Sequence, residues 1–88
     1  MKCIVKVANK ANLSEKTKRH AMSIMNDISN KEISAGKDPM GLAATVLYLA
    51  SLKTDEKITQ LDISTAAGIA IVTLRNRLRD LRSQLDFH

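Results

Sequence analysis

Four arginines near the C-terminal end are the residues best suited to do chemistry in this chain. Of its five arginines, only Arg19 lies far from the cluster of Arg75, Arg77, Arg79 and Arg82. A guanidinium neutralises phosphate, and its planar fork can donate two parallel hydrogen bonds to guanine O6 and N7. Because the chain also carries a net charge of +5, this clustering favours a polyanionic partner.

The spacing of these arginines predicts one helix with two different faces. An apolar face, which we expect to be buried, repeats at intervals of three and four residues. It consists of Ile71, Leu74, Leu78, Leu81 and Leu85. A second stripe, rotated away from the first, combines charge with one small apolar side chain. It consists of Val72, Arg75, Arg79 and Arg82. Such a stripe is either an ordinary solvated face or a binding surface.

As a binding surface, this helix divides into two parts. Arg75 lies in the first turns, where it can pair with guanine, and a Val72 methyl group can contact a thymine methyl. Each good bidentate pair contributes ~1–3 kcal/mol of discrimination between bases. Arg77, Arg79 and Arg82 lie further along, so we expect them to contact phosphates and to supply affinity rather than sequence preference.

The segment before this helix predicts a helix-turn-helix. Thr59 and Asp62 fit a capping box with Asp in place of Glu, which starts a short helix at residues 60–67. Gly68 fits the left-handed position that ends a helix. Ala70 then stands at the N-cap of the last helix, where Ser, Thr or Asp would bond the first amides. Those N–H groups are therefore open to a phosphate or to water.

Three earlier helices are expected at about residues 2–11, 15–30 and 39–52. Ser14 is the expected N-cap of the second, and Asp38 that of the third, with Pro39 at its first position. The third helix is uncharged throughout, so we expect it to be buried among the others. The sequence thus predicts an all-α chain, one domain over residues 1–88, with a helix-turn-helix at about residues 59–85.

Catalytic, metal and membrane functions find no support in the composition. Cys3 is the single cysteine, and with only His20 and His88 beside it no zinc-ligand spacing or catalytic triad is recognisable. Tyr48 and Phe87 are the only aromatic residues, which disfavours base-stacking platforms for single strands. The longest uncharged run is too short to cross a bilayer. We therefore expect a soluble, intracellular non-enzyme without cofactor or metal that binds double-stranded DNA.

Two parts of the chain resemble a known family. Residues 36–39, 42–44 and 47–51 resemble the buried-helix signature of a cyclin-like repeat in the family of archaeal transcription factor B and eukaryotic transcription factor IIB. Residues 67–77, AGIAIVTLRNR, closely resemble the start of the recognition helix in that family's second repeat. The similarity covers essentially the whole chain as one repeat.

This resemblance implies a five-helix cyclin-like fold and a role in transcription initiation. It implies promoter DNA as a partner, read at the B-recognition element upstream of the TATA box, next to TATA-binding protein. Val72 and Arg75 match the base-contacting positions of the family, and Thr73 matches a neighbouring phosphate or groove contact. Ile71 stands where an acidic residue is expected, which bears on the preferred base sequence.

The chain lacks two parts that the family resemblance implies. A zinc ribbon that recruits RNA polymerase and a first cyclin-like repeat are absent. This indicates an excised C-terminal piece or a shortened relative, with polymerase contact made by the missing N-terminal parts. We expect a monomer, cytoplasmic in an archaeon or nuclear in a eukaryote.

The alternative is a cyclin-like protein-interaction module without sequence-specific DNA binding, in which Lys16, Lys18 and Arg19 meet an acidic partner. Another kind of basic helix-turn-helix regulator is a lesser alternative. The third-helix signature argues against it.

Overall fold

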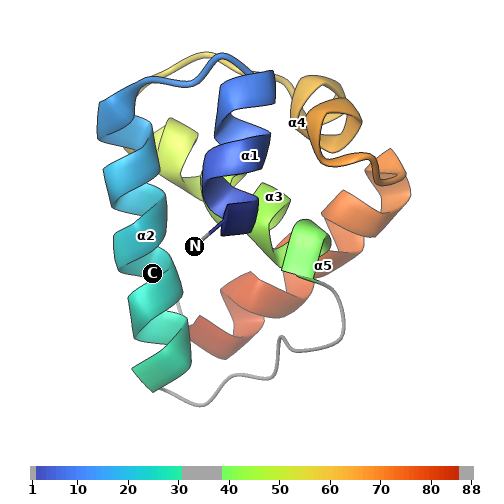
Figure 1. The fold of residues 1–88 in the computed structure, drawn as a ribbon. Coiled ribbons are helices and arrows are strands. Elements are labelled where there is room, and N and C mark those ends of the chain that lie inside the picture. The colour runs from blue at the N-terminus through green and yellow to red at the C-terminus, as the bar shows by residue number, and fades with distance from the viewer. Residues whose placement is uncertain (1, 31–38, 86–88) are drawn as a thin grey trace.

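Five helices make up the computed structural model, which describes residues 2–30 and 39–85 and contains no strand in those residues (Figure 1). In chain order they are α1 (Lys2–Lys10), α2 (Glu15–Asn30), α3 (Pro39–Lys53), α4 (Gln60–Ala67) and α5 (Ile71–Leu85). The all-α class is confirmed, and every expected helix bound lies within one residue of the observed one. The expected N-cap Asp38 lies outside the described residues.

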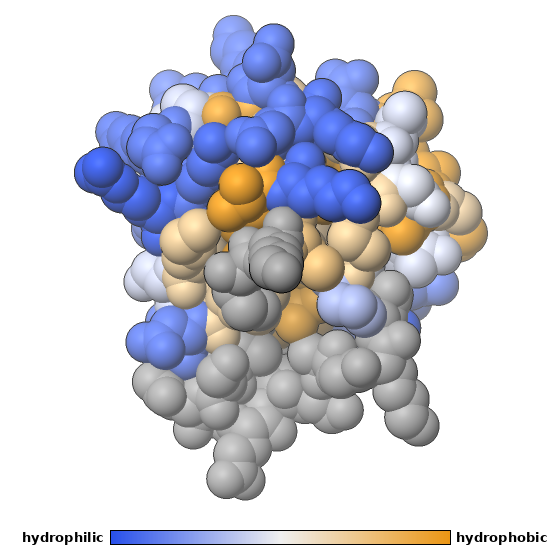
Figure 2. Space-filling model, in the orientation of Figure 1, coloured by the Kyte–Doolittle hydropathy of each residue, from blue (hydrophilic) through white to orange (hydrophobic). Residues whose placement is uncertain are grey.

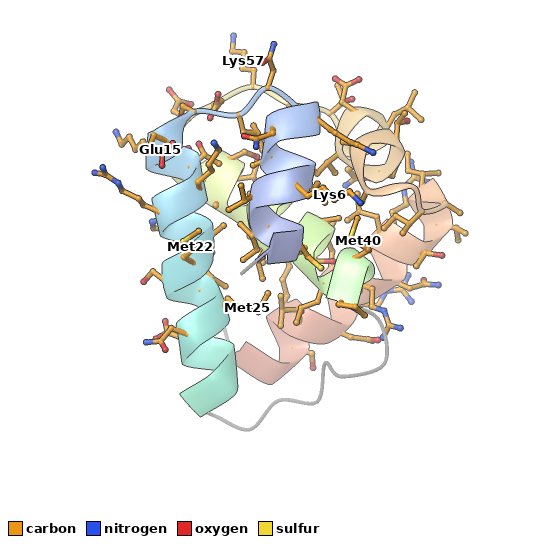
Figure 3. All side chains as sticks on the ribbon, in the orientation of Figure 1. Lys6, Glu15, Met22, Met25, Met40 and Lys57 are labelled. Atoms are coloured by element: carbon orange, nitrogen blue, oxygen red, sulfur yellow. The ribbon has the colours of Figure 1, made fainter. Side chains whose placement is uncertain are left out.

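The central position of α3 organises the molecule. It packs against each of the other four helices, and Figure 1 shows it running behind α1 between α2 and α5. Its buried residues lie on all sides of the helix, as its lack of a polar face predicts. Ile4 of α1, Leu47 of α3, Ile63 of α4 and Leu74 of α5 are fully buried in one shared core. Met25 points from α2 toward the same core (Figure 3).

Buried hydroxyl groups on α3 and α4 find partners on their own helices. The Thr45 hydroxyl donates to the Gly41 carbonyl at 2.7 Å, and the Ser64 hydroxyl donates to the Leu61 carbonyl at 2.9 Å. Within the described residues, no buried side-chain nitrogen or oxygen lacks a partner. These polar residues therefore enter the core without the cost of an unsatisfied group.

The first turn of α2 is capped both by its own neighbour and by a distant carboxylate. Ser14 is the N-cap, as expected, because its hydroxyl accepts the Thr17 N–H at 3.3 Å. Glu56, from the loop between α3 and α4, accepts the Ser14 N–H at 3.1 Å and the Ser14 hydroxyl at 2.9 Å. The buried Thr17 hydroxyl also donates to Glu56 and lies 2.7 Å from the Thr54 hydroxyl. This cluster ties the α3–α4 loop to α2.

The hydrogen bond from Thr17, together with those from Ser14, lowers the pKa of Glu56 below its ordinary value, against the opposing effect of burial. A carboxyl group whose pKa falls on folding stabilises the fold above its unfolded pKa, and this stabilisation is lost as the pH falls through the folded pKa.

We expect Glu56→Gln to lower the free energy of unfolding at pH 7 by about 1 kcal/mol. Urea unfolding at pH 7 and at pH 3 measures this, and the difference between the two proteins should shrink at pH 3. Asp27→Asn, at an exposed residue of α2, is the control. An unchanged difference at both pH values would contradict the assigned role of the carboxylate.

Left-handed residues end three of the helices. They are Asn12, Asp55 and Gly68, with φ of 62°, 60° and 71°. The residue after each donates its N–H to a carbonyl five residues earlier, as in a Schellman motif. The expected role of Gly68 as the left-handed residue that ends α4 is thereby confirmed.

Replacing Gly68 by alanine should lower the free energy of unfolding by about 1 kcal/mol, because the left-handed conformation is unfavourable for a residue with a Cβ. Apart from the glycine itself and its two chain neighbours, no heavy atom lies within 4 Å of where that Cβ would stand, so the cost comes from the backbone rather than from a clash. Urea unfolding measures the loss, and Gly68→Asn should lose less because Asn tolerates this conformation. An equal or larger loss for Gly68→Asn would contradict this explanation.

Of the two hydrogen bonds in the capping box predicted at the start of α4, one is confirmed. The Thr59 hydroxyl accepts the Asp62 N–H at 3.0 Å, as expected. The reciprocal bond of a capping box, from the Thr59 N–H to the Asp62 side chain, does not form in the described residues. Asp is one methylene shorter than the Glu or Gln that usually spans this distance.

Candidate nucleic-acid interface

Helices α4 and α5 form the expected helix-turn-helix. They pack against each other and are joined by the short turn of Gly68, Ile69 and Ala70. In Figure 1, α4 is seen nearly end-on while α5 runs across the lower right, so the two helices cross steeply. The apolar face of α5 is confirmed as a buried stripe at Leu74, Leu78 and Leu81. Ile71 is partly buried, and the side chain of Leu85 lies outside the described ones.

On α5, the second stripe predicted from the sequence is exposed. Val72 is 58% exposed although it is apolar, and Arg75, Arg79 and Arg82 are exposed with it. At 3.6 residues per turn these four positions fall within an arc of about 80° on the helix. α5 therefore carries one continuous surface of one apolar and three cationic side chains.

Two other predicted contact residues lie apart from this stripe. The outermost line of α5 is the line along the helix that lies farthest from the core. By the same helical period, Thr73 and Arg77 fall on one side of this line and the three arginines of the stripe fall on the other. Thr73 is half-buried and Arg77 is exposed. A helix in a major groove has a phosphate backbone on each side, so the two flanks can face different strands.

The charges of the stripe are available to a partner. Within the described residues, neither Arg79 nor Arg82 makes an ion pair. The pair between Lys18 and Glu15, at 3.5 Å, belongs to α2. Asp80 is exposed on α5 as well, and it is the one acidic residue of that helix. The basic character of α5 is therefore only partly offset.

The start of α5 keeps open hydrogen-bond donors, as expected. The Ala70 carbonyl accepts the N–H groups of Thr73 and Leu74 at 3.0 and 3.2 Å. Among the described residues, no acceptor is found for the N–H groups of Ile71 and Val72. Ala70 itself is exposed, so a phosphate can approach this end of the helix.

Sequence reasoning missed two polar residues at this surface. Gln60, the first residue of α4, accepts a hydrogen bond from the Arg75 Nε at 3.1 Å. Asn76 is exposed and lies next to Val72 on the outermost line of α5, where an amide can pair with adenine. The four-residue spacing between Val72 and Asn76 is a signal that could have found the second. The Gln60 contact depends on how α4 and α5 cross, which no local pattern reports.

In the residues that it describes, the structure gives no support for a metal site or a membrane span. No three His, Cys, Asp or Glu side chains gather in the way a metal ion needs in the part of the chain that the structure describes. None of the described helices combines the length and the apolar character that a bilayer crossing requires. His20 is half-buried on α2, and Cys3 is a half-buried free cysteine on α1.

Comparison with known proteins agrees with this architecture. The family model described as the transcription factor TFIIB repeat matches residues 1–84. Among curated relatives, transcription initiation factor IIB 2 of Haloferax volcanii is 41% identical over 78 residues, covering 89% of this chain and 24% of that protein. Transcription initiation factor IIB of Saccharolobus shibatae is 40% identical over 82 residues, covering 93% of this chain and 27% of that protein.

A third relative, transcription initiation factor IIB 1 of Thermococcus kodakarensis, is 40% identical over 81 residues, covering 92% of this chain and 27% of that protein. The chain thus spans about a quarter of the length of the curated relatives it matches. Since the family model covers nearly all of its residues, the chain belongs to the transcription factor TFIIB repeat family and has the all-α, cyclin-like fold of that repeat.

Proposed function

We propose that this chain is a DNA-reading module of transcription initiation. In this role it binds promoter duplex at the B-recognition element upstream of the TATA box, next to TATA-binding protein, during preinitiation complex assembly. The observation that carries the proposal is the exposed stripe of α5, which combines Val72 with Arg75, Arg79 and Arg82 on the second helix of a helix-turn-helix. The names of the relatives support the same process. Catalysis has no part in the proposal.

The proposed contacts follow from the two ends of α5. Val72 and Arg75, in the first turns, contact base edges in the major groove. Arg79 and Arg82 on one flank, with Arg77 on the other, contact phosphates. The open N–H groups after Ala70, beside Thr73, are placed for one more phosphate. Because the contacts are few and the module is taken to act as a monomer, its own affinity should be on the order of micromolar or weaker.

A fluorescence anisotropy titration tests the proposal. One labelled duplex carries a TATA box with its upstream element, and the second carries the same TATA box with that element scrambled. We expect tighter binding to the first, and log K falling with log salt at a slope of about −3, as for three or four phosphate contacts. Equal binding to both duplexes, or no salt dependence, would count against the proposal.

A second candidate function is docking of a protein partner. A groove of about 680 Å³ lies between the end of α1, the α3–α4 loop and α4, and Leu61 on its wall is 60% exposed. Figure 2 shows hydrophilic residues over the start of α2 and lighter, more apolar residues at the edge over α4.

Of the cations considered for an acidic partner, Lys16 and Arg19 are exposed, whereas Lys18 is paired with Glu15. Binding to TATA-binding protein through this surface, without DNA affinity at low salt, would favour this function.

A further inference from the structure

A hydrogen bond across the helix-turn-helix joins the first residue of α4 to the exposed stripe of α5. The Arg75 Nε donates to the Gln60 Oε1 at 3.1 Å, although the two residues lie 15 positions apart. Gln60 is half-buried at the start of α4, and Arg75 is exposed. The contact therefore lies at the edge of the exposed stripe of α5. Without it, a side chain as long as arginine would sample many rotamers at such an exposed position.

The donors and acceptors of the two side chains determine which of their groups remain for a further hydrogen bond. Arginine has donors only, so the glutamine atom that it meets must be the carbonyl oxygen. The amide NH₂ of Gln60 then keeps both of its hydrogens for another acceptor. On Arg75 the bond occupies Nε and leaves the edge formed by the two terminal nitrogens, which is the edge that a bidentate contact to guanine can use.

For a bidentate contact to guanine, the orientation of the Arg75 guanidinium matters more than its charge alone. A bidentate contact requires both N–H groups to lie in the plane of the base pair, and each rotamer that must be abandoned on binding lowers the affinity. Gln60 fixes one end of the planar group before any duplex arrives. Its own NH₂, at the start of the first helix of the motif, is placed for a phosphate, because that helix crosses the DNA backbone.

We propose that Gln60 is a positioning residue for sequence discrimination: it holds Arg75 in the orientation that reads one base pair, and it donates its amide to a neighbouring phosphate. The inference rests on the proposed function of α5. It goes beyond that function by giving α4 a part in sequence readout. Two variants separate the two roles, because Gln60→Glu keeps an acceptor for Arg75 and loses the amide donor, whereas Gln60→Ala loses both.

The first readout uses the 88-residue chain without DNA. In Gln60→Ala, the Arg75 Nε–H signal in a ¹⁵N correlation spectrum should shift and its exchange with water should quicken. In Gln60→Glu the signal should stay protected. Leu61→Ala changes the next, 60% exposed residue and is the matched control, with no expected effect on Arg75. An Arg75 signal that is identical in all variants would overturn the inference.

The second readout is binding to TATA-box duplexes in which the upstream base pairs are substituted one at a time. Gln60→Ala should reduce discrimination about two- to tenfold at the same base pair that Arg75→Ala affects. The double variant should lose no more discrimination than Arg75→Ala alone. Gln60→Glu should keep discrimination and weaken binding to all duplexes alike, since its carboxylate repels phosphate. Circular dichroism melting verifies that each variant folds.

The outcomes distinguish this inference from the proposed function. If the unsubstituted chain discriminates between duplexes and Gln60→Ala discriminates equally well, the positioning role is wrong and the DNA-reading role of α5 stands. If the unsubstituted chain binds no duplex, or binds all alike, the proposed function fails and the inference fails with it.

Discussion

Leu74→Ala is expected to lower the free energy of unfolding by about 3 kcal/mol, a large part of the stability of a domain of this size. Leu74 is fully buried on the inner face of α5, so its truncation leaves a cavity between this helix and the core around α3. Urea unfolding followed by circular dichroism measures the loss. Val72→Ala is the matched control because it truncates an apolar side chain that is 58% exposed on the same helix. Its stability should change by less than about 0.5 kcal/mol.

The same pair of variants also separates folding from binding. Val72→Ala should keep the fold while weakening the preference for a thymine at one position, since its methyl group is assigned to a thymine methyl. Leu74→Ala should weaken binding to every duplex alike, in proportion to the unfolded fraction. If Val72→Ala destabilised the protein as much as Leu74→Ala, the assignment of the two faces of α5 would be wrong.

Arg75→Ala is expected to reduce discrimination between the intact and the scrambled upstream element by about tenfold or more, as for the loss of one bidentate base contact. Arg79→Ala is its matched partner, because it removes an exposed arginine from the same stripe of α5. It should weaken binding to both duplexes to the same extent and reduce the salt slope by about 1. Anisotropy titrations at three salt concentrations measure both effects. Equal behaviour of the two variants would contradict the division into base and phosphate contacts.

Local features of the fold could be predicted because each depends on residues close in sequence. The left-handed Gly68, the Thr59 cap and the buried stripe through Leu74 and Leu78 all follow from spacing within one or two helical turns. The exposed stripe from Val72 to Arg82 follows from the same period. Its sorting into base and phosphate contacts stays a prediction.

Contacts that cross the chain could not be predicted in this way. The Glu56 cap on α2 joins residues 42 positions apart at Ser14, and the bond between Gln60 and Arg75 depends on the crossing of α4 and α5. Both require the packed arrangement around α3 before the side chains can meet. The separation of Arg77 from the stripe, by contrast, could have been derived from the helical period alone.

The most direct test of the central claim, that α5 reads duplex DNA, is an amide chemical-shift titration of the ¹⁵N-labelled chain at low salt. The duplexes are the TATA box with its upstream element intact and the same TATA box with the element scrambled. If this claim holds, the shifts should concentrate between Ala70 and Arg82, with a smaller set at the start of α4, and should differ between the two duplexes. Absent shifts, or shifts spread identically over all basic residues with both duplexes, would contradict it.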